Sequence, residues 1–244
     1  MEIIFQGKKR NMFVIKIGGS ILFDEQGQLN QKLISQYANT IKDVFSGTKN
    51  KCAIIVGGGK IARKYIAVAR ALGASEAYND VLGIEAAKLN ARLLISSLGD
   101  IAYPDPPASF QEYQALSNLT DKIIVCGGFQ PGQSTNAVAA SVAELTHAEK
   151  FINLTDVDGV YSADPDKDPS AKLLSEMTID DFMLLIASQN TRAGQYPLFD
   201  YTAVQIVKRS AINLQFVNGN NPDNIRKAIE NKKIGTLITH KKKL

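Results

Sequence analysis

The sequence has no tryptophan and only two cysteines and two histidines among its 244 residues. With His147 and His240 as the full histidine complement, we expect neither a histidine-rich metal site nor a serine–histidine hydrolase. Cys52 and Cys126 each lie in or beside an apolar run, and they lack the C-x-x-C spacing. We therefore expect buried, reduced thiols, which fit a cytoplasmic protein.

Long hydrophobic runs are also missing, and so is a strong charge on the body of the chain. No apolar run approaches the ~20 residues that cross a bilayer, and residues 1–10 lack the apolar core of a signal peptide. The formal net charge of +4 comes from the basic clusters at residues 8–10 and 241–243. Removing these six from the 28 basic residues leaves 22, against 24 acidic ones. Because the body is nearly neutral, we expect no membrane and no nucleic-acid partner.

Glycine-rich turns are what the sequence does contain. Three apolar, strand-like runs each lead into such a turn, at residues 16–20, 57–60 and 127–135. Backbone N–H groups at the start of a helix that follows such a turn bind anions. One of these turns alone is common in α/β proteins, but three together, with Lys60 at the mouth of one, favour a polyphosphate ligand.

The third turn nearly fits the phosphate-loop pattern of glycine, four residues, glycine, lysine and serine. The matching positions are Gly127, Gly132, Gln133 and Ser134, with Gln133 in place of the lysine. The loop could hold a phosphate, but the cation for phosphoryl transfer must come from elsewhere in the chain.

Three cations are candidates for that charge, since phosphoryl transfer depends on positioning and charge neutralisation. They are Lys16 at a strand end, Arg63 at a helix start, and Lys172. Asp158 could orient Lys16 or help to place the magnesium that accompanies ATP. The alternative is that the cations lie on solvated faces and that Asp158 forms a turn with Gly159.

A dinucleotide-binding oxidoreductase is a second possibility. Gly57, Gly59 and Ala62 fit the G-x-G-x-x-A pattern, and Asp80 lies at the distance where such proteins bind a ribose. That acidic residue ends a strand in dinucleotide folds, whereas residues 73–79 do not resemble a strand. We therefore favour a kinase. Asp80 could alternatively cap a helix that begins near Val81.

Apolar patterns alternate between strands and helices along the whole chain. The expected strands are residues 12–15, 53–56, 123–126, 150–155, 213–217 and 235–239. The expected helices are residues 61–72, 81–98, 137–145, 179–186, 201–210 and 222–230, with Thr178 and Asp200 as caps of two of them and turns at Asp164 and Asp168. This alternation predicts an α/β fold in which one continuous, mostly parallel sheet is covered by helices on both faces.

Together these segments resemble the amino-acid kinase superfamily and, within it, the uridylate (UMP) kinases of archaeal type. The matching motifs are residues 16–20, 56–66, 127–135, 156–161 and 163–165, and the resemblance runs from about Met12 to Thr239. Within the superfamily, the GGGxxAR run at residues 57–63 and the PGQST loop at residues 131–135 resemble those of the uridylate kinases. Isopentenyl phosphate kinases place a histidine soon after the triple glycine, and residues 60–70 contain none.

The resemblance implies a role for individual residues. Lys16 and Asp158 would be catalytic. The residues implied to bind ATP are Gly18, Gly19, Ser20, Gly59, Arg63, Thr155, Asp156, Tyr161, Asp164 and Lys172. The residues implied to bind UMP are Gly58, Asp80, Phe129, Gln130, Pro131, Gly132, Gln133, Ser134 and Thr135. No metal site of the protein's own is implied, because Mg²⁺ would arrive with ATP.

The resemblance also implies a three-layer αβα sandwich and a domain layout. Residues 1–11 would be an N-terminal extension and residues 241–244 a basic tail. Residues 12–240 would form one amino-acid kinase domain, with an acceptor-binding part at 12–148 and an ATP-binding part at 149–240.

The implied activity is the reversible, ATP- and Mg²⁺-dependent phosphorylation of UMP to UDP in pyrimidine nucleotide synthesis. The resemblance further implies a cytoplasmic homohexamer, a trimer of dimers, with UTP as a feedback inhibitor. Two alternatives stay open: another small-molecule kinase of the superfamily, acting on isopentenyl phosphate or an acylamino acid, and a non-catalytic relative that stores nucleotides or oxoanions. The retained Lys16, Arg63 and Asp158 favour an enzyme over storage.

Overall fold

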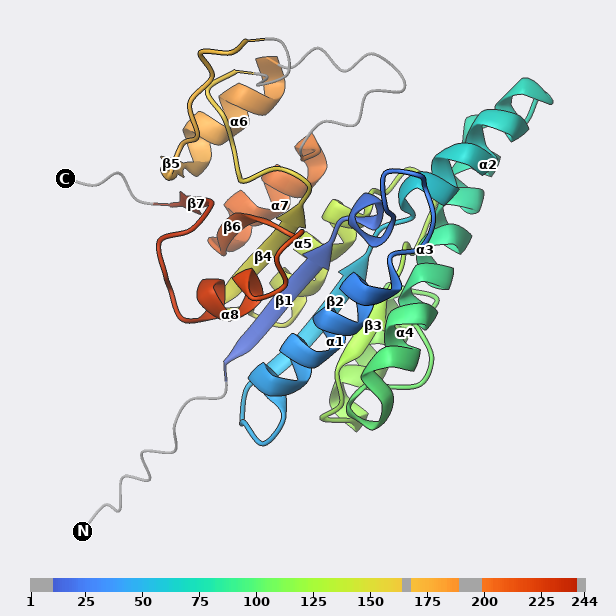
Figure 1. The fold of residues 1–244 in the computed structure, drawn as a ribbon, viewed down its shortest axis with the longest axis horizontal. Helices are drawn as coiled ribbons and strands as arrows, with labels where there is room; N and C mark the ends of the chain where they lie inside the picture. Colours follow the sequence, from blue (N-terminus) through green and yellow to red (C-terminus); the bar gives the residue numbers. More distant parts are fainter. Residues whose placement is uncertain (1–10, 164–167, 189–198, 241–244) are drawn as a thin grey trace.

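The structure is a computed structural model that describes residues 11–163, 168–188 and 199–240. Within these residues one seven-stranded sheet forms the centre of the molecule, in the order β3-β2-β1-β4-β6-β7-β5 (Figure 1). The strands are β1 (Met12–Ile17), β2 (Lys51–Val56), β3 (Ile124–Cys126), β4 (Lys150–Thr155), β5 (Glu176–Thr178), β6 (Asn213–Asn218) and β7 (Thr236–Thr239). All pairings are parallel except β6 with β7, which confirms the mostly parallel single sheet.

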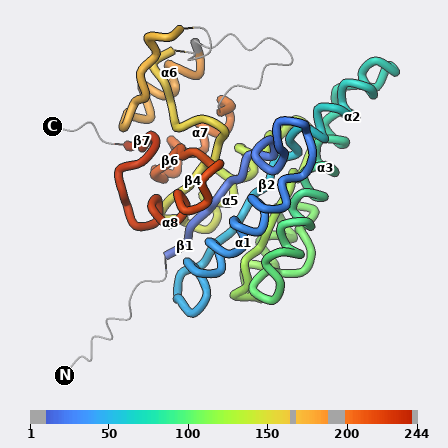
Figure 2. Tube along the Cα trace, in the orientation of Figure 1, coloured from blue at the N-terminus to red at the C-terminus, as the bar shows by residue number. Residues whose placement is uncertain are grey.

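Helices cover both faces of the sheet. They are α1 (Gln31–Phe45), α2 (Gly59–Ala71), α3 (Glu76–Leu98), α4 (Phe110–Leu119), α5 (Thr135–Leu145), α6 (Ile179–Ser188), α7 (Tyr201–Ser210) and α8 (Asn224–Ile229), with short 3₁₀ turns η1 (Gly19–Leu22) and η2 (Gly99–Ile101). One core joins α1, α3 and α8 to the sheet, and the other joins α4, α5, α6 and α7 to its opposite face. Figure 2 shows α1 and α8 in front of the strands, with α5 behind them. The expected three layers are confirmed.

The central strands are buried along most of their length, as expected for a parallel sheet covered on both sides. Every residue of β4 is buried. The register places Lys16 of β1 between Ile55 of β2 and Asn153 of β4. Because residues paired in a parallel register point to the same face, Lys16 and Asn153 both lie on the α5 face of the sheet.

Three elements go beyond those expected from the sequence, namely α1, α4 and β5. The helical signal of α1 is present in the sequence, because Leu33, Tyr37 and Ile41 recur at helical spacing and are all buried. The strand β5 is short and partly exposed at the sheet edge, so it has no apolar pattern to reveal it. The expected turn at Asp164 lies outside the described residues.

Two expectations from composition can be checked directly. Cys52 and Cys126 are buried free thiols, and burial raises the pKa of both well above the usual range. Among the helices that the structure describes, none is both long and apolar enough to cross a membrane.

Candidate active site

A cavity of about 600 Å³ lies at the carboxyl ends of the central parallel strands. It is lined by the segments that follow β1, β2 and β3 and by the end of β4, together with residues of α2, α3 and α5. Open α/β sheets bind ligands at this edge, where neighbouring strands send their connections to opposite faces. The volume is in the range of small-molecule sites.

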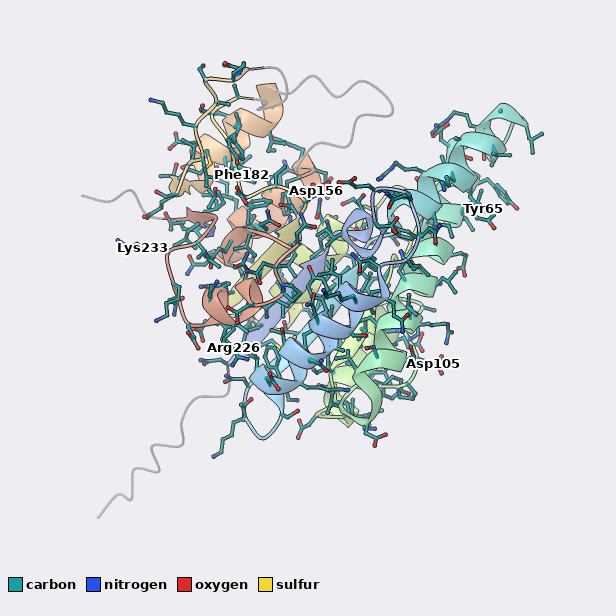
Figure 3. The ribbon with its side chains drawn as sticks, in the orientation of Figure 1. Tyr65, Asp105, Asp156, Phe182, Arg226 and Lys233 are labelled. Carbon is teal, nitrogen blue, oxygen red and sulfur yellow. The ribbon has the colours of Figure 1, made fainter. Side chains whose placement is uncertain are left out.

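Fourteen of the residues expected at the site line this one cavity, although they come from segments far apart in the sequence. They are Lys16, Gly18, Gly19, Ser20, Gly58, Gly59, Arg63, Asp80, Gly132, Gln133, Ser134, Thr135, Thr155 and Asp156. Figure 3 labels Asp156 where β4 ends.

The first two glycine-rich turns are pressed against each other at the floor of the cavity. A side-chain carbon on Gly19 would lie 2.2 Å from the Gly57 carbonyl oxygen, and one on Gly59 would lie 2.3 Å from the Gly19 carbonyl. Gly59 also has a φ of +64°, in the left-handed region. The close approach of these backbones requires glycine and brings the turns after β1 and β2 to one ligand.

Two helices begin at the cavity. Helix α2 starts at Gly59 with no side chain capping it, so its first N–H groups stay available. Helix α5 is capped by Ser134, whose hydroxyl oxygen accepts a hydrogen bond of 3.0 Å from Ala137 N–H. Both N-termini carry partial positive charge and favour an anionic ligand between them.

The cap of α5 is hydrogen-bonded to the cap of α7. The Ser134 hydroxyl donates to one carboxylate oxygen of Asp200 at 2.5 Å, and the other oxygen accepts from Ala203 N–H at 2.9 Å. Asp200 thus caps α7, as expected from the sequence, but it also reaches the glycine-rich loop before α5.

Lys16 is the cation of the cavity with a perturbed pKa. Burial lowers the pKa of its half-buried ammonium to about 8, while the carboxylates of Asp156 and Asp200 oppose that shift. A lysine in this state is protonated at neutral pH and only partly solvated. It is therefore suited to stabilise negative charge that develops on a phosphoryl group.

A second cation, Arg63, lines the same cavity from near the start of α2. Its guanidinium donates a hydrogen bond of 3.0 Å to the Ser20 hydroxyl, and the neighbouring Lys60 ammonium donates to the carbonyl of Asp24. These contacts join the start of α2 to the segment after β1, so Arg63 is held at the cavity wall.

Asp80 lies inside helix α3, not at its start. The helix begins at Glu76 and is capped by Ser75, whose hydroxyl oxygen accepts from Tyr78 N–H. The expected start near Val81 is therefore wrong, and so is the capping role for Asp80. The dinucleotide hypothesis loses support as well, because its acidic residue must follow a strand.

Other expected site residues do not line the cavity. Phe129, which the cavity leaves out together with Gln130 and Pro131, packs edge-on against Phe110 at 6.4 Å between ring centroids. Asp158 accepts a hydrogen bond of 2.8 Å from the Asn218 side chain.

The remaining three expected ATP residues lie in the segment after β4. Tyr161 pairs with Leu173 in an isolated bridge, and Lys172 N–H donates to the Ser162 hydroxyl at 3.0 Å. Asp164 is outside the described residues. Their roles, like that of Asp158, stay predictions.

Four polar residues at or near the cavity were not expected from the sequence as site residues: Asp200, Asn90, Asn136 and Asn153. Asn136 lines the cavity with a buried carbonyl oxygen that has no hydrogen-bond partner among the described residues. Asn153 is fully buried, and neither the nitrogen nor the oxygen of its side-chain amide has a hydrogen-bond partner among the described residues. Of these four, only Asp200 had a signal in the sequence, because its position before a helical pattern predicts a helix cap. Nothing in the sequence around any of the four indicates that it lies near Lys16.

The donor set fits a magnesium ion bound through nucleotide phosphates. No cluster of three or more metal-binding side chains occurs in the part of the chain that the structure describes. Asp156 and Asp200 both act on Lys16 at the cavity. Mg²⁺ commonly uses one or two carboxylates, with water and phosphate oxygens completing its shell.

Comparison with known proteins agrees with this geometry. Residues 11–218 match the amino acid kinase family. The chain is 45% identical to the uridylate kinase of Methanobrevibacter smithii, over 93% of this chain and 99% of that protein. It is 43% identical to the uridylate kinase of Methanothermobacter thermautotrophicus, over 92% and 97%.

Two solved structures have the same fold. The uridylate kinase of Archaeoglobus fulgidus superposes with a TM-score of 0.81 at 39% identity, covering 93% of this chain and 99% of that one. The UMP kinase of Bacillus anthracis, at 23% identity and a TM-score of 0.74, supports the fold alone. The chain therefore belongs to the amino acid kinase family and groups within it with the archaeal uridylate kinases.

Proposed function

We propose that this protein is a uridylate kinase, which transfers the terminal phosphoryl group of ATP to UMP and yields ADP and UDP, reversibly. The observation that carries the proposal is the position of Lys16 in a cavity that the N-termini of α2 and α5 both line. The names and identities of the archaeal relatives support UMP as the acceptor.

The residues of the cavity divide the work of phosphoryl transfer, which depends mainly on positioning and on charge. Lys16 neutralises charge on the transferred group. Arg63 lies where the phosphates of the two nucleotides meet, and the amide groups at the start of α2 hold the phosphate of UMP. Asp156 and Asp200 favour the protonated form of Lys16 and keep it charged while the cavity is partly desolvated.

ATP is the phosphoryl donor in this proposal, and Mg²⁺ would be held at the carboxylates of Asp156 and Asp200. When bound, the ion supplies neutralisation of phosphate charge. Thr155 and Asp156, at the end of β4, border the ATP side of the cavity, and the loop from Gly132 to Thr135 borders the UMP side.

The order of the strands supports the two-part layout of the domain at residues 12–148 and 149–240. Strands β3, β2 and β1 form one half of the sheet, and β4, β6, β7 and β5 form the other. The acceptor part would be the first half and the ATP-binding part the second, with the cavity at their junction.

A homo-oligomer, a hexamer built from dimers, belongs to the same proposal. Exposed apolar side chains gather along α2 and at its C-terminal end, where Tyr65, Val68 and Leu72 are 61%, 61% and 82% exposed. Figure 3 labels Tyr65 on α2. Such surfaces favour protein contacts. Cytoplasmic localisation, a place in pyrimidine nucleotide synthesis and inhibition by UTP at the UMP site complete the proposal.

The proposal is tested by product identification. Wild-type protein incubated with UMP, ATP and Mg²⁺ should form UDP and ADP in equal amounts, measured by anion-exchange chromatography. A reaction without protein gives the background, and Lys16→Met, which keeps the length of the side chain and removes its charge, should form much less UDP than the wild type. UDP formation by the wild type at the level of the protein-free reaction would sink the proposal.

A further inference from the structure

The side chain of Asn90 is hydrogen-bonded to the glycine-rich turn after β2. Asn90 lies on α3, is 3% exposed, and donates hydrogen bonds from its amide nitrogen to the carbonyl oxygens of Gly57 at 2.8 Å and Gly58 at 3.2 Å. We propose that Asn90 is a positioning residue that orients the N–H groups of Gly58 and Gly59 toward the phosphate of the acceptor nucleotide. The identification of this phosphate as that of UMP rests on the proposed function.

The geometry of the peptide unit carries the first step. In a trans peptide, the carbonyl of one residue and the N–H of the next point in opposite directions. The described residues contain no cis peptide bond. Because the Gly57 and Gly58 carbonyls both point at Asn90, the N–H groups of Gly58 and Gly59 both point away from it.

Those two N–H groups face the ligand side of the turn. Gly58 and Gly59 line the cavity, and neither N–H has a hydrogen-bond acceptor within the described part of the chain. Gly59 is the first residue of α2, so its N–H also carries the partial positive charge of the helix terminus. Two successive backbone donors in the same cavity as Arg63 form a cradle for phosphate oxygens.

The turn has no side chain of its own to fix this orientation. Three consecutive glycines occupy it, and Gly59 is in the left-handed region of backbone space with a φ of +64°. Glycine gives up more conformational freedom on ordering than other residues, so an external contact is needed to select one arrangement of the peptides. Apart from Asn90, the turn is tied by the bond from Gly57 N–H to the Ile17 carbonyl and by a longer bond of 3.4 Å from Ala62 N–H to the Gly58 carbonyl, while Asn90 is the side chain that bonds to both carbonyls.

An asparagine suits this task for a chemical reason. Its NH₂ group supplies two donors without a charge, so it can serve two carbonyls from a buried position at little desolvation cost. Aspartate has the same shape but presents acceptors, which would repel both carbonyls. Replacement by aspartate should therefore turn the peptides away from their present orientation.

The experiment compares Asn90→Asp with Asn79→Asp. Asn79 is the matched control because it is buried on the same helix, at 1% exposure, and its amide nitrogen bonds to Glu76 of its own helix at 3.2 Å. The dissociation constants of UMP and of a non-hydrolysable ATP analogue are measured by titration calorimetry for each variant, with KM values for UMP and ATP alongside. Melting temperatures show which variants are folded.

Asn90→Asp should raise the dissociation constant and the KM of UMP at least about 10-fold, the loss expected for one hydrogen bond to a charged group. The constants for the ATP analogue and ATP should stay within about twofold, and Asn79→Asp should bind UMP like the wild type. If Asn90→Asp does not fold, Asn90→Ala takes its place and should weaken UMP binding by about 3–10-fold.

Equal weakening of UMP and of the ATP analogue, or UMP affinity in the folded Asn90 variant equal to that of Asn79→Asp, would overturn the positioning role. A wild-type protein that does not bind UMP would instead overturn the proposed function and this inference with it. The two failures are thus distinguishable.

Discussion

The carboxylate of Asp80 accepts a hydrogen bond of 2.8 Å from the backbone N–H of Gly132. The contact joins helix α3 to the loop before α5, across 52 positions of sequence. Both residues line the cavity. Asp80 therefore helps to hold the wall against which the acceptor nucleotide would lie, and its second role, binding the ribose of UMP, stays a prediction.

Asp80→Asn separates those two roles. If the carboxylate also accepts a hydrogen bond from the ribose 2′-hydroxyl, the wild type should use dUMP roughly 10–100-fold less well than UMP, and the variant should lose much of that preference. If the residue only holds the loop, KM values for UMP and dUMP should rise together. In either case the KM of ATP and the melting temperature should change little. Unchanged UMP kinetics would remove Asp80 from the site.

Lys16→Ala tests the central cation. We expect kcat to fall by about 10²–10³, because charge stabilisation by a preorganised group matters most in the transition state, while ATP binding weakens much less. Single-turnover measurement of UDP formation gives the rate, and calorimetry with a non-hydrolysable ATP analogue gives the binding. Turnover close to that of the wild type would exclude Lys16 from catalysis.

The pH dependence of kcat/KM for ATP should report the ionisation of Lys16 in the free enzyme. Because burial lowers its pKa to about 8, the cation is present below that pH and is lost as the pH rises through it. The rate constant should therefore fall above about pH 8.

Two variants test whether this fall in kcat/KM at alkaline pH, the alkaline limb, is due to Lys16. Lys16→Arg should abolish it, because a guanidinium keeps its charge throughout this range. Asp200→Asn should move it to lower pH, since it removes a carboxylate that raises the pKa of Lys16, while asparagine still caps α7. A limb at the same pH in both variants would mean that another group titrates.

Comparing Asp158→Asn with Asp200→Asn shows which of these two carboxylates supports Lys16. From the sequence we expect Asp158 to be catalytic, whereas the charges acting on Lys16 in the structure belong to Asp156 and Asp200. Asp158 instead bonds to Asn218 at 2.8 Å. We expect a smaller loss of kcat in Asp158→Asn than in Asp200→Asn, measured in parallel at pH 7. The reverse order would restore the sequence-based assignment.

Gly59→Ala tests the contact between the two glycine-rich turns. The added methyl group would collide with Gly19 at 2.3 Å and adopt an unfavourable φ of +64°. Gly73→Ala is the matched control, because Gly73 has a φ of +87° but no atom within 4 Å. The control should lose about 1–2 kcal/mol of unfolding free energy.

Gly59→Ala should lose more than the control in urea denaturation, and most of its UMP turnover as well. Equal unfolding free energies for the two variants would mean that the turns separate without cost, and that their close approach is not required by the fold.

The sequence predicts those features of the fold that depend on local patterns. The apolar run at residues 150–155 and the glycine-rich turns at 57–60 and 127–135 correspond to β4 and to the starts of α2 and α5. Helix α4 also has a local signal that we did not use. Ser109 caps it, and Glu112 three residues later accepts from Ala108 N–H, which is close to a capping box.

Features that depend on tertiary contact could not be predicted in this way. Asp200 acts on Lys16 although 184 positions separate them, because α7 packs against α5 on the face of the sheet where Lys16 lies. The antiparallel pairing of β6 with β7 follows from the path of the chain between them, not from a residue pattern. Asn90 has the same limitation, since an asparagine inside a helix does not indicate which backbone it contacts.

The most direct test of the account is the choice of phosphoryl acceptor. ADP release is measured with a coupled assay at equal concentrations of UMP, CMP, dUMP, isopentenyl phosphate and acetylglutamate, with the Lys16→Ala variant as background. The account predicts that UMP has the highest kcat/KM by a wide margin, because the loop from Gly132 to Thr135, Arg63 and the start of α2 together form a site for a mononucleotide phosphate. Faster turnover of isopentenyl phosphate or acetylglutamate than of UMP would contradict it.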